Sequence, residues 1–126
     1  MIVTKTPLRI SFFGGGSDIP QFYEENEGMV ISTAINSYIY LAVNRCVASH
    51  LRVIYSELEQ VESLDDIKHN RVREVLRHFE LPSNIEIASF SDVPTKGTGL
   101  GSSSTFTVGL VNAIHRITSG RNICLL

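Results

Sequence analysis

The chain has 126 residues, which is enough for one domain with a real core and too few for two ordinary ones. With 43% hydrophobic residues, 19% charged residues and a net charge of −2, it has the composition of a globular protein and no general nucleic-acid footprint. Its two cysteines, Cys46 and Cys124, form no disulfide or metal framework, which fits a reducing cytosol and a cytoplasmic location.

The first element expected is a strand over residues 2–13, which are apolar and β-favouring. It ends at a turn of three glycines, and residues 19–25 then predict a short helix with Pro20 in its first turn. Ser17 or Asp18 is a candidate N-cap for that helix. Arg9 on the strand has an ordinary interpretation as a surface side chain lying along apolar neighbours.

The next segment has to be checked for membrane insertion, because residues 28–44 carry no charged side chain. The segment is at the lower limit of spanning length and contains several hydroxyl and amide side chains. Its β-branched residues and tyrosines favour two strands or one long bent strand over residues 29–46 instead. We therefore expect no membrane role. Another strand is expected over residues 51–56.

A helix is predicted to begin at Ser63–Asp66, which resembles a capping box. Apolar residues then recur at helical spacing, namely Ile67, Val72, Val75, Leu76 and Phe79. The remaining face is interpreted as solvated and comprises His69, Arg71, Arg73, Glu74, Arg77 and His78. Leu81-Pro82 ends this helix, and a strand over residues 85–90 follows.

Residues 94–105 form a glycine- and serine-rich turn that leads into a helix whose apolar face is Phe106, Leu110, Ala113, Ile114 and Ile117. Gly97, Gly99 and Gly101 allow positive φ and a close approach of a ligand to the backbone. The first amides of a helix lack intrahelical partners and favour anions, so the turn predicts a phosphate site. A plain loop with a helix cap is the alternative. Gly120 is a candidate helix stop.

Two common phosphate-binding patterns do not fit this turn. The P-loop requires a Lys after its last glycine, and none follows Gly101; the dinucleotide fingerprint requires its last glycine where Ser102 stands.

Strands and helices alternate irregularly along the chain, which predicts an α+β fold of two layers, with helices on a mostly antiparallel sheet.

A resemblance narrows these options. Pro94 to Ser103 resembles the second motif of the small-molecule kinase superfamily of galactokinase, homoserine kinase, mevalonate kinase and phosphomevalonate kinase, the GHMP kinases. Pro7 to Asp18 resembles the first motif, and its three glycines with Ser-Asp look most like those of the heptose 7-phosphate kinases. The resemblance covers residues 1–117 and implies the family's amino-terminal domain, a fold also found in certain ribosomal proteins.

The resemblance implies a role for each matching residue. Arg9 matches a basic residue that acts on the transferred phosphoryl group, and Asp18 matches the acid that binds sugar hydroxyls. Gly15, Gly16 and Ser17 belong to the same sugar-phosphate turn. The implied ATP site comprises Lys96, Gly97, Thr98, Gly99, Leu100, Gly101, Ser102, Ser103 and Ser104. Ser103 would also contact Mg²⁺, so ATP and magnesium are the expected co-substrate and cofactor.

The resemblance also implies parts that the chain does not supply. Family members have a metal-binding glutamate, a catalytic aspartate and a carboxy-terminal domain, and no residue after Ser103 can be assigned those roles. We therefore expect an incomplete domain over 1–117, a non-family tail over 118–126, an inactive fragment and an exposed apolar interdomain face. A fucose- or galactose-type kinase and a non-catalytic nucleotide- or sugar-binding module remain alternatives, whereas the acidic balance disfavours an RNA-binding domain.

Overall fold

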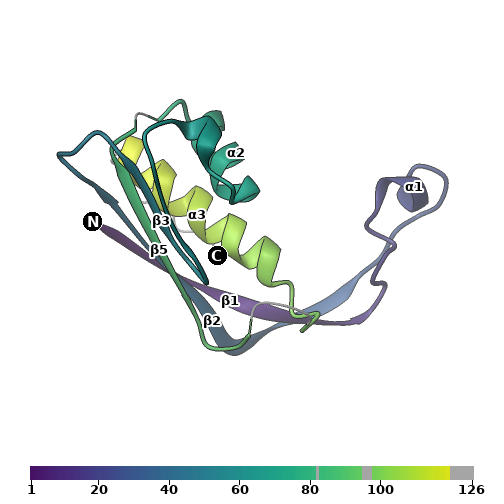
Figure 1. Ribbon diagram of the computed structural model, residues 1–126. Coiled ribbons are helices and arrows are strands. Elements are labelled where there is room, and N and C mark those ends of the chain that lie inside the picture. The colour runs from purple at the N-terminus through teal and green to yellow at the C-terminus, as the bar shows by residue number, and fades with distance from the viewer. Residues whose placement is uncertain (82, 95–97, 120–126) are drawn as a thin grey trace.

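The computed structural model describes residues 1–81, 83–94 and 98–119. A five-stranded sheet forms one layer, and helices α2 and α3 cover one of its faces (Figure 1). The two-layer α+β prediction is therefore confirmed. The strands are β1 (Ile2–Phe13), β2 (Ile31–Arg45), β3 (Leu51–Ile54), β4 (Leu58–Val61) and β5 (Ile85–Ser91). The helices are α1 (Pro20–Tyr23), the 3-10 helix η1 (Leu64–Asp66), α2 (Asn70–His78) and α3 (Ser102–Ser119).

The sheet has the order β1-β2-β5-β3-β4. Neighbouring strands are antiparallel except β3 and β5, which are parallel because β4, η1 and α2 make the crossover between them. Strand β4 was not predicted from the sequence. Its charged Glu59 is the buried residue and its Leu58 is exposed, the reverse of the usual apolar-in pattern.

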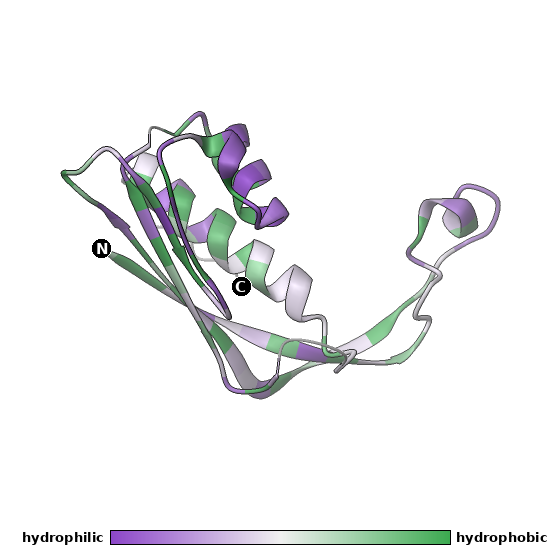
Figure 2. Cartoon of the chain, in the orientation of Figure 1, coloured by the Kyte–Doolittle hydropathy of each residue, from purple (hydrophilic) through white to green (hydrophobic). Residues whose placement is uncertain are grey.

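Strands β1 and β2 form a long ribbon whose far half extends away from the helices (Figure 1). β2 is one continuous strand, the second of the two forms expected for this segment, and its pairing with β1 shifts register between Pro7 and Arg9. From Ile39 onward β2 also pairs with β5, whereas its earlier residues pair only with β1. We call this far half, with the α1 turn at its tip, the arm. Apolar segments recur along the arm (Figure 2). Several of its large apolar side chains are exposed, including Phe12, Phe13, Met29 and Ile31.

Helix α3 packs on the sheet through the face predicted from its periodicity. Phe106, Leu110, Ala113 and Ile114 are buried, and Ile117 packs at the edge of the same core. The sheet contributes Leu8, Ile39, Leu41, Val43, Leu51, Val53, Ile85 and Ile87, and the segment from η1 to α2 contributes Ile67, Val72, Val75 and Leu76. None of the helices in the described part of the chain has the length and apolar character needed to span a bilayer.

Two predicted helix starts were wrong. Ser63 accepts a hydrogen bond from the amide of Asp65 and so caps only η1, while α2 begins at Asn70 after an extended Ile67. The N-cap of α1 is Ile19, without a side-chain hydrogen bond, so neither Ser17 nor Asp18 caps that helix. The predicted stops at Pro82 and Gly120, and Cys124, lie outside the described residues.

Gly109 is the point of closest approach between α3 and the sheet. Thr4 Oγ1 donates a hydrogen bond to the Gly109 carbonyl at 3.2 Å, across 105 positions of sequence. A Cβ at residue 109 would lie 2.7 Å from Thr6 Oγ1 and 3.1 Å from Leu41 Cδ1. The helix can lie this close to the strands only because the residue has no side chain.

We expect Gly109→Ala to lower the free energy of unfolding by about 1–2 kcal/mol, because overpacking outweighs the gain in helix propensity. Urea unfolding followed by circular dichroism measures this. Thr6→Ala removes the nearest atom, so the double variant should recover part of the loss relative to Thr6→Ala alone. If Gly109→Ala raises the stability, the contact does not constrain the helix.

Candidate functional site

The turn before α3 has the conformation that its glycines predict. Gly99 and Gly101 have φ of 67° and 72°, the left-handed region that favours glycine. The amide of Thr105 donates to the Gly101 carbonyl, which is the first hydrogen bond of the helix. The amides of Ser102, Ser103 and Ser104 therefore have no intrahelical acceptor and are available to an anion. Lys96 and Gly97 lie outside the described residues.

Arg9 lies directly against this turn. Its backbone amide donates to the Leu100 carbonyl at 3.2 Å, and its guanidinium donates to Ser11 Oγ at 2.9 Å. A Cβ at Gly101 would lie 3.2 Å from the guanidinium carbon, so Gly101 also makes room for Arg9. A cavity of about 340 Å³ is lined by Arg9 and the six residues Thr98–Ser103. The structure thus brings one predicted catalytic residue together with the predicted phosphate loop.

The polar groups of this cavity are only partly satisfied. Thr98 Oγ1 is buried and has no hydrogen-bond partner among the described residues. A buried hydroxyl without a partner is costly, and an oxygen-rich ligand in the cavity would remove that cost.

The predicted sugar turn lies at the other end of the ribbon. Gly14 and Gly16 have φ of 84° and 95°, and a Cβ at Gly14 would collide with the Met29 carbonyl, whereas Gly15 faces open space. The Ser17 hydroxyl donates to the carbonyls of Gly14 and Met29, at 2.8 and 2.9 Å, and so joins the two strands at the tip of the arm. Asp18 is exposed, and its Oδ1 accepts from the Gly16 amide at 3.2 Å.

Arg9 and the sugar turn are therefore not neighbours in this structure. The five residues of extended chain from Arg9 to Gly14 span about 16 Å, and the arm carries the turn away from α3 (Figure 1). The hydrogen bonds of Ser17 stabilise the turn at the tip of the arm. One oxygen of Asp18 and the open side of Gly15 face solvent.

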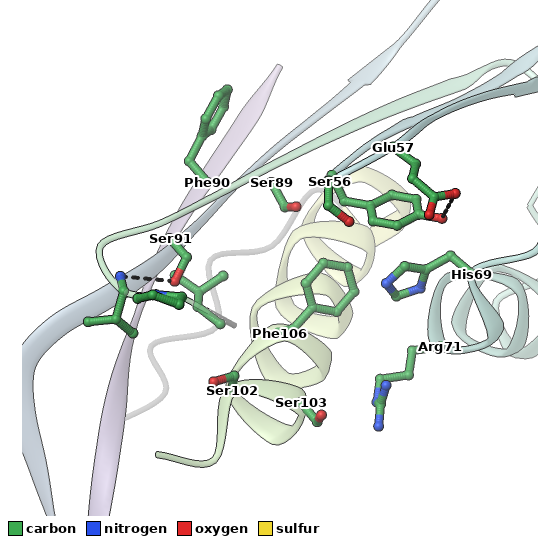
Figure 3. A pocket seen from close by; sticks show the side chains of 14 residues that line it. Ser56, Glu57, His69, Arg71, Ser89, Phe90, Ser91, Ser102, Ser103 and Phe106 are labelled. Carbon is green, nitrogen blue, oxygen red and sulfur yellow. Dashed lines mark hydrogen bonds between the residues drawn. The ribbon is translucent and has the colours of Figure 1, made fainter. Parts of the chain in front are cut away.

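A second, larger cavity of about 500 Å³ lies on the other side of the α3 start. Ser102 and Ser103 line both cavities, so the first turn of α3 separates them. The larger one is bounded by the ends of β3 and β5, by the start of α2 and by Phe106 of α3 (Figure 3). We call it the helix pocket.

His69 and Arg71 line the helix pocket, although the sequence interpretation placed both on a solvated face. That interpretation was wrong for His69, which is only partly exposed. Its ring packs edge-on against Tyr55 and at a tilt against Phe106, with centroids 4.9 and 5.0 Å away. One signal was available: Ile67 and Val72 are five residues apart, which breaks the helical spacing and indicates a separate turn between them.

His69 also fixes the start of α2. Its Nδ1 accepts a hydrogen bond from the Val72 amide at 3.3 Å and so acts as the N-cap. A nitrogen that accepts carries no proton, so the neutral ring has its hydrogen on Nε2. Burial lowers the pKa of His69, and the positive charge of Arg71 acts in the same direction.

Glu59 holds the turn that carries His69. Its side chain is buried, and it accepts hydrogen bonds from the amide of Lys68 at 2.6 Å, from the amide of His69 at 3.1 Å and from the Tyr55 hydroxyl at 2.9 Å. Burial opposes the charge of Glu59, but these donors outweigh it and lower its pKa. Burial, followed by the hydrogen bond to Glu59, raises the pKa of Tyr55 to about 12.

Arg71 and Ser103 line the same end of the helix pocket (Figure 3). The Arg71 guanidinium makes no hydrogen bond or ion pair with the described residues, unlike Arg77 on the same helix, which bonds Asp65 and Glu74 at 2.8 Å. Among the described residues no group of three or more His, Cys, Asp or Glu side chains could hold a metal ion. This end of the pocket therefore presents positive charge, helix amides and hydroxyls, which suit an anion.

Residues 69–123 match the family model "GHMP kinases N terminal domain". The chain is 32% identical to the D-glycero-alpha-D-manno-heptose 7-phosphate kinase of Campylobacter jejuni, in an alignment that covers 89% of this chain and 36% of the relative.

Two solved structures have the same fold. One is a D-glycero-D-manno-heptose 1-phosphate kinase from Bacteroides thetaiotaomicron, with a TM-score of 0.81 and 24% identity over 94% of this chain and 42% of that one. The other is the Methanococcus jannaschii mevalonate kinase, with a TM-score of 0.72 and 17% identity over 97% of this chain and 42% of that one. The chain thus spans about two fifths of the length of these proteins.

The lowered pKa of His69 predicts an acid-dependent loss of stability. Below the ordinary value of 6.5, unfolded His69 takes up a proton that the folded state resists, so unfolding becomes easier as the pH falls. His69→Asn keeps an N-capping oxygen but lacks this titration. We expect the stability of the original chain, relative to that of His69→Asn, to fall between about pH 7.5 and 5.

Urea unfolding at several pH values measures the difference. The lowered pKa of Glu59 also makes stability depend on pH, but only as the pH falls below the ordinary carboxyl value of 4.5, so it does not interfere. If the free energy of unfolding depends on pH in the same way for both proteins, His69 has the same pKa in the folded and the unfolded chain, and the prediction is wrong.

Proposed function

We propose that this chain, which is a GHMP kinase amino-terminal domain in sequence and in fold, forms the ATP-binding and sugar-binding part of a sugar-phosphate kinase. The proposed substrate is D-glycero-D-manno-heptose 7-phosphate, because the relative with 32% identity carries that name. The γ-phosphoryl group of ATP would pass to the anomeric hydroxyl, giving ADP and a heptose bisphosphate for surface-polysaccharide precursors. Use of ATP suits a cytoplasmic enzyme.

One observation carries the nucleotide half of this proposal. The turn before α3 presents unpaired helix amides between two cavities, with the Arg9 guanidinium against Gly101 on one side and the helix pocket on the other. Phosphates of ATP would lie over Thr98–Ser104, where helix amides and serine hydroxyls donate to them. Arg9 would stabilise the charge that develops on the phosphoryl group in transfer. Lys96 and Gly97 belong to the same proposed loop.

Magnesium would arrive with ATP as part of the substrate. Its preferred ligands are oxygens, and it usually keeps several waters while bound to phosphates and one or two protein groups. The Ser103 hydroxyl fits one such position, because it is exposed at the phosphate turn and hydrogen-bonds to no described residue. When bound, the ion would neutralise charge on the phosphates.

The sugar half of the proposal lies on the arm. Asp18 keeps one carboxylate oxygen free for sugar hydroxyls, and Gly15 and Gly16 leave room for a bulky sugar phosphate. Ser17 supports this turn through its bonds to Gly14 and Met29. Because Arg9 is about 16 Å from the turn, the arm has to bend toward α3, or the sugar has to reach across, for transfer to occur.

The proposed reaction also needs groups from outside these 126 residues. The family's metal-binding glutamate and catalytic aspartate have no counterpart after Ser103. We infer that the exposed apolar side chains of the arm contact the remainder of such a kinase, and that the 126-residue chain binds MgATP without turning it over. Loss of general-base help alone slows a reaction by about 10²–10⁴-fold.

The first test of this proposal is nucleotide binding by the chain itself. MgATP should shift the amide resonances of Gly99 to Ser104, with weak affinity. Arg71→Gln should weaken binding by about 1 kcal/mol, roughly fivefold, because a charge-assisted contact to phosphate is lost. Arg77→Gln is the matched control, since Arg77 is already paired on the same helix. A folded sample whose loop resonances do not move at millimolar MgATP contradicts the assignment.

The second test separates the two halves of the site in a catalytically active form of the enzyme. Asp18→Ala should mainly raise the KM for the sugar, by the equivalent of about 1–3 kcal/mol. Arg9→Ala should lower kcat more than it raises KM, because its contact strengthens as charge develops in the transition state. Steady-state kinetics with both substrates varied distinguish the two patterns.

Gly15 supplies a matched pair for the same experiment. A side chain here meets no atom within 4 Å, so Gly15→Ala should leave the turn and the sugar KM nearly unchanged. Gly15→Glu should block the sugar phosphate by bulk and like charge. If Gly15→Glu is tolerated, or Asp18→Ala leaves the sugar KM unchanged, the turn does not bind the substrate.

A further inference from the structure

The face of the sheet opposite α2 and α3 is covered by no helix in the part of the chain that the structure describes (Figure 1). The centre of this face is nevertheless apolar, whereas a sheet face in water normally carries polar side chains. Its apolar side chains come from four of the five strands and alternate with the buried residues; they are Val3, Tyr40, Ala42, Leu58, Ala88 and Phe90. Val3, Leu58 and Phe90 are 59%, 61% and 63% exposed. We call this set the open face, and an exposed apolar surface of this kind marks an interaction site.

Charged side chains border the open face at both ends of its strands. At one end Lys5 Nζ lies 3.9 Å from the centroid of the Tyr38 ring, and the Tyr38 amide donates to the Asp92 carboxylate at 2.9 Å. At the other end Arg52 and Glu86 form an ion pair of 3.6 Å. An apolar centre with a polar, charged rim is the usual composition of a specific protein interface.

The strand pairing arranges the open face in rows. Tyr40 of β2 is the partner of Phe90 of β5, so these two rings lie side by side. Ala42 is the partner of Ala88, and this row of two methyl groups comes next along the strands, about 7 Å away. The Phe90 ring points away from the helix pocket, on the other side of the sheet (Figure 3). A row of large side chains therefore adjoins a row of small ones on the same two strands.

We propose that the open face binds the open face of a second copy of this chain. The two-fold axis of this dimer runs across the strands, between the row of rings and the row of alanines, and so exchanges the two rows. Tyr40 and Phe90 of each copy then lie over Ala42 and Ala88 of the other. Two packed sheets are about 10 Å apart, and their side chains interdigitate over that distance. The inference goes beyond the proposed function and does not depend on it.

The same axis brings opposite charges together. It exchanges the end of the open face that holds Asp92 with the end that holds Arg52 and Glu86, because these ends lie one row beyond the rings and one row beyond the alanines. Arg52 of one copy then lies between its own Glu86 and Asp92 of the other copy. The sizes of the side chains and their charges thus favour the same position of the axis.

The size of the open face indicates how strong the dimer is. Strands about 4.8 Å apart and rows about 7 Å apart give a face of about 20 Å by 25 Å, or about 500 Å² in projection. A stable complex buries about 800 Å² on each partner. The face is therefore large enough for a specific dimer but for a weak one, which dissociates at micromolar concentrations of the chain.

The test is sedimentation velocity of the 126-residue chain from micromolar to millimolar concentration, which gives the Kd of the dimer. Phe90→Ser should raise the Kd at least about tenfold, because aromatic side chains at the centre of an interface supply much of its binding energy. Ala88→Phe adds apolar surface but fills the position over which Phe90 of the second copy has to lie, so it should also raise the Kd. The double variant Ala88→Phe/Phe90→Ala exchanges ring and methyl group on β5 and should recover part of the affinity. Val108→Ser, on the exposed side of α3, is the control and should change nothing.

Circular dichroism establishes that each variant is folded, and an NMR signal reports the contact directly. In a mixture of labelled and unlabelled chains, the Ala88 methyl group of one copy should show a nuclear Overhauser effect to the Phe90 ring of the other. A chain that stays monomeric at millimolar concentration overturns the proposal. So does a lower Kd for Ala88→Phe, because the open face would then associate through apolar surface in general. If Phe12→Ser dissociates the dimer and Phe90→Ser does not, the arm is the interface and the open face is not.

Discussion

The close seating of helix α3 on the first two strands is the constraint on which the rest of the molecule depends. Gly109 lets the helix backbone approach Thr4 and Leu41, and two buried threonines tie it there. Thr4 Oγ1 donates to Gly109 at 3.2 Å, and Thr105 Oγ1 donates to the Pro7 carbonyl at 3.4 Å. Because both hydrogen bonds join α3 to β1, they fix the position along β1 at which the helix begins. The amide of Arg9 then donates to the Leu100 carbonyl, so the turn before α3 is fixed by the core and not by the loop alone.

The same constraint forms the helix pocket. Phe106 projects from the second turn of α3 and contacts His69, and His69 is in turn the N-cap of α2. The position of α3 on the sheet therefore fixes the pocket wall opposite the turn before α3. Glu59 does not line the pocket but supports this wall from the sheet side, through hydrogen bonds that cross from β4 to the segment before α2. A charged side chain is stable in this buried place because backbone amides and the Tyr55 hydroxyl satisfy it.

Much of this could be predicted from the sequence where local patterns are strong. The periodicity of α3 and the alternation in β5 agree with their burial, and the strands expected over 2–13 and 29–46 are found at 2–13 and 31–45. The left-handed glycines before α3 followed from the phosphate-loop pattern. Strand β4 could not be predicted from an apolar pattern, because its buried residue is Glu59, whose carboxylate accepts hydrogen bonds from amides about ten positions away. The position of His69 also depends on tertiary packing, since only the folded chain brings Tyr55 and Phe106 into contact with its ring.

The two predicted halves of the site differ in how the fold supports them. Arg9 lies where β1 is covered by α3, and its surroundings are built by the core. The sugar turn lies beyond the part of β2 that pairs with β5, on a ribbon of two strands, and such ribbons have little stability of their own. Its tip is closed by the Ser17 hydroxyl, and its apolar side chains Phe12 and Phe13 remain exposed. The predicted nucleotide half is thus held by the core, whereas the position of the predicted sugar half depends on whatever contacts the arm. The proposed phosphoryl transfer would succeed only when both substrates are aligned, so placement of the arm would be the step that assembles the site.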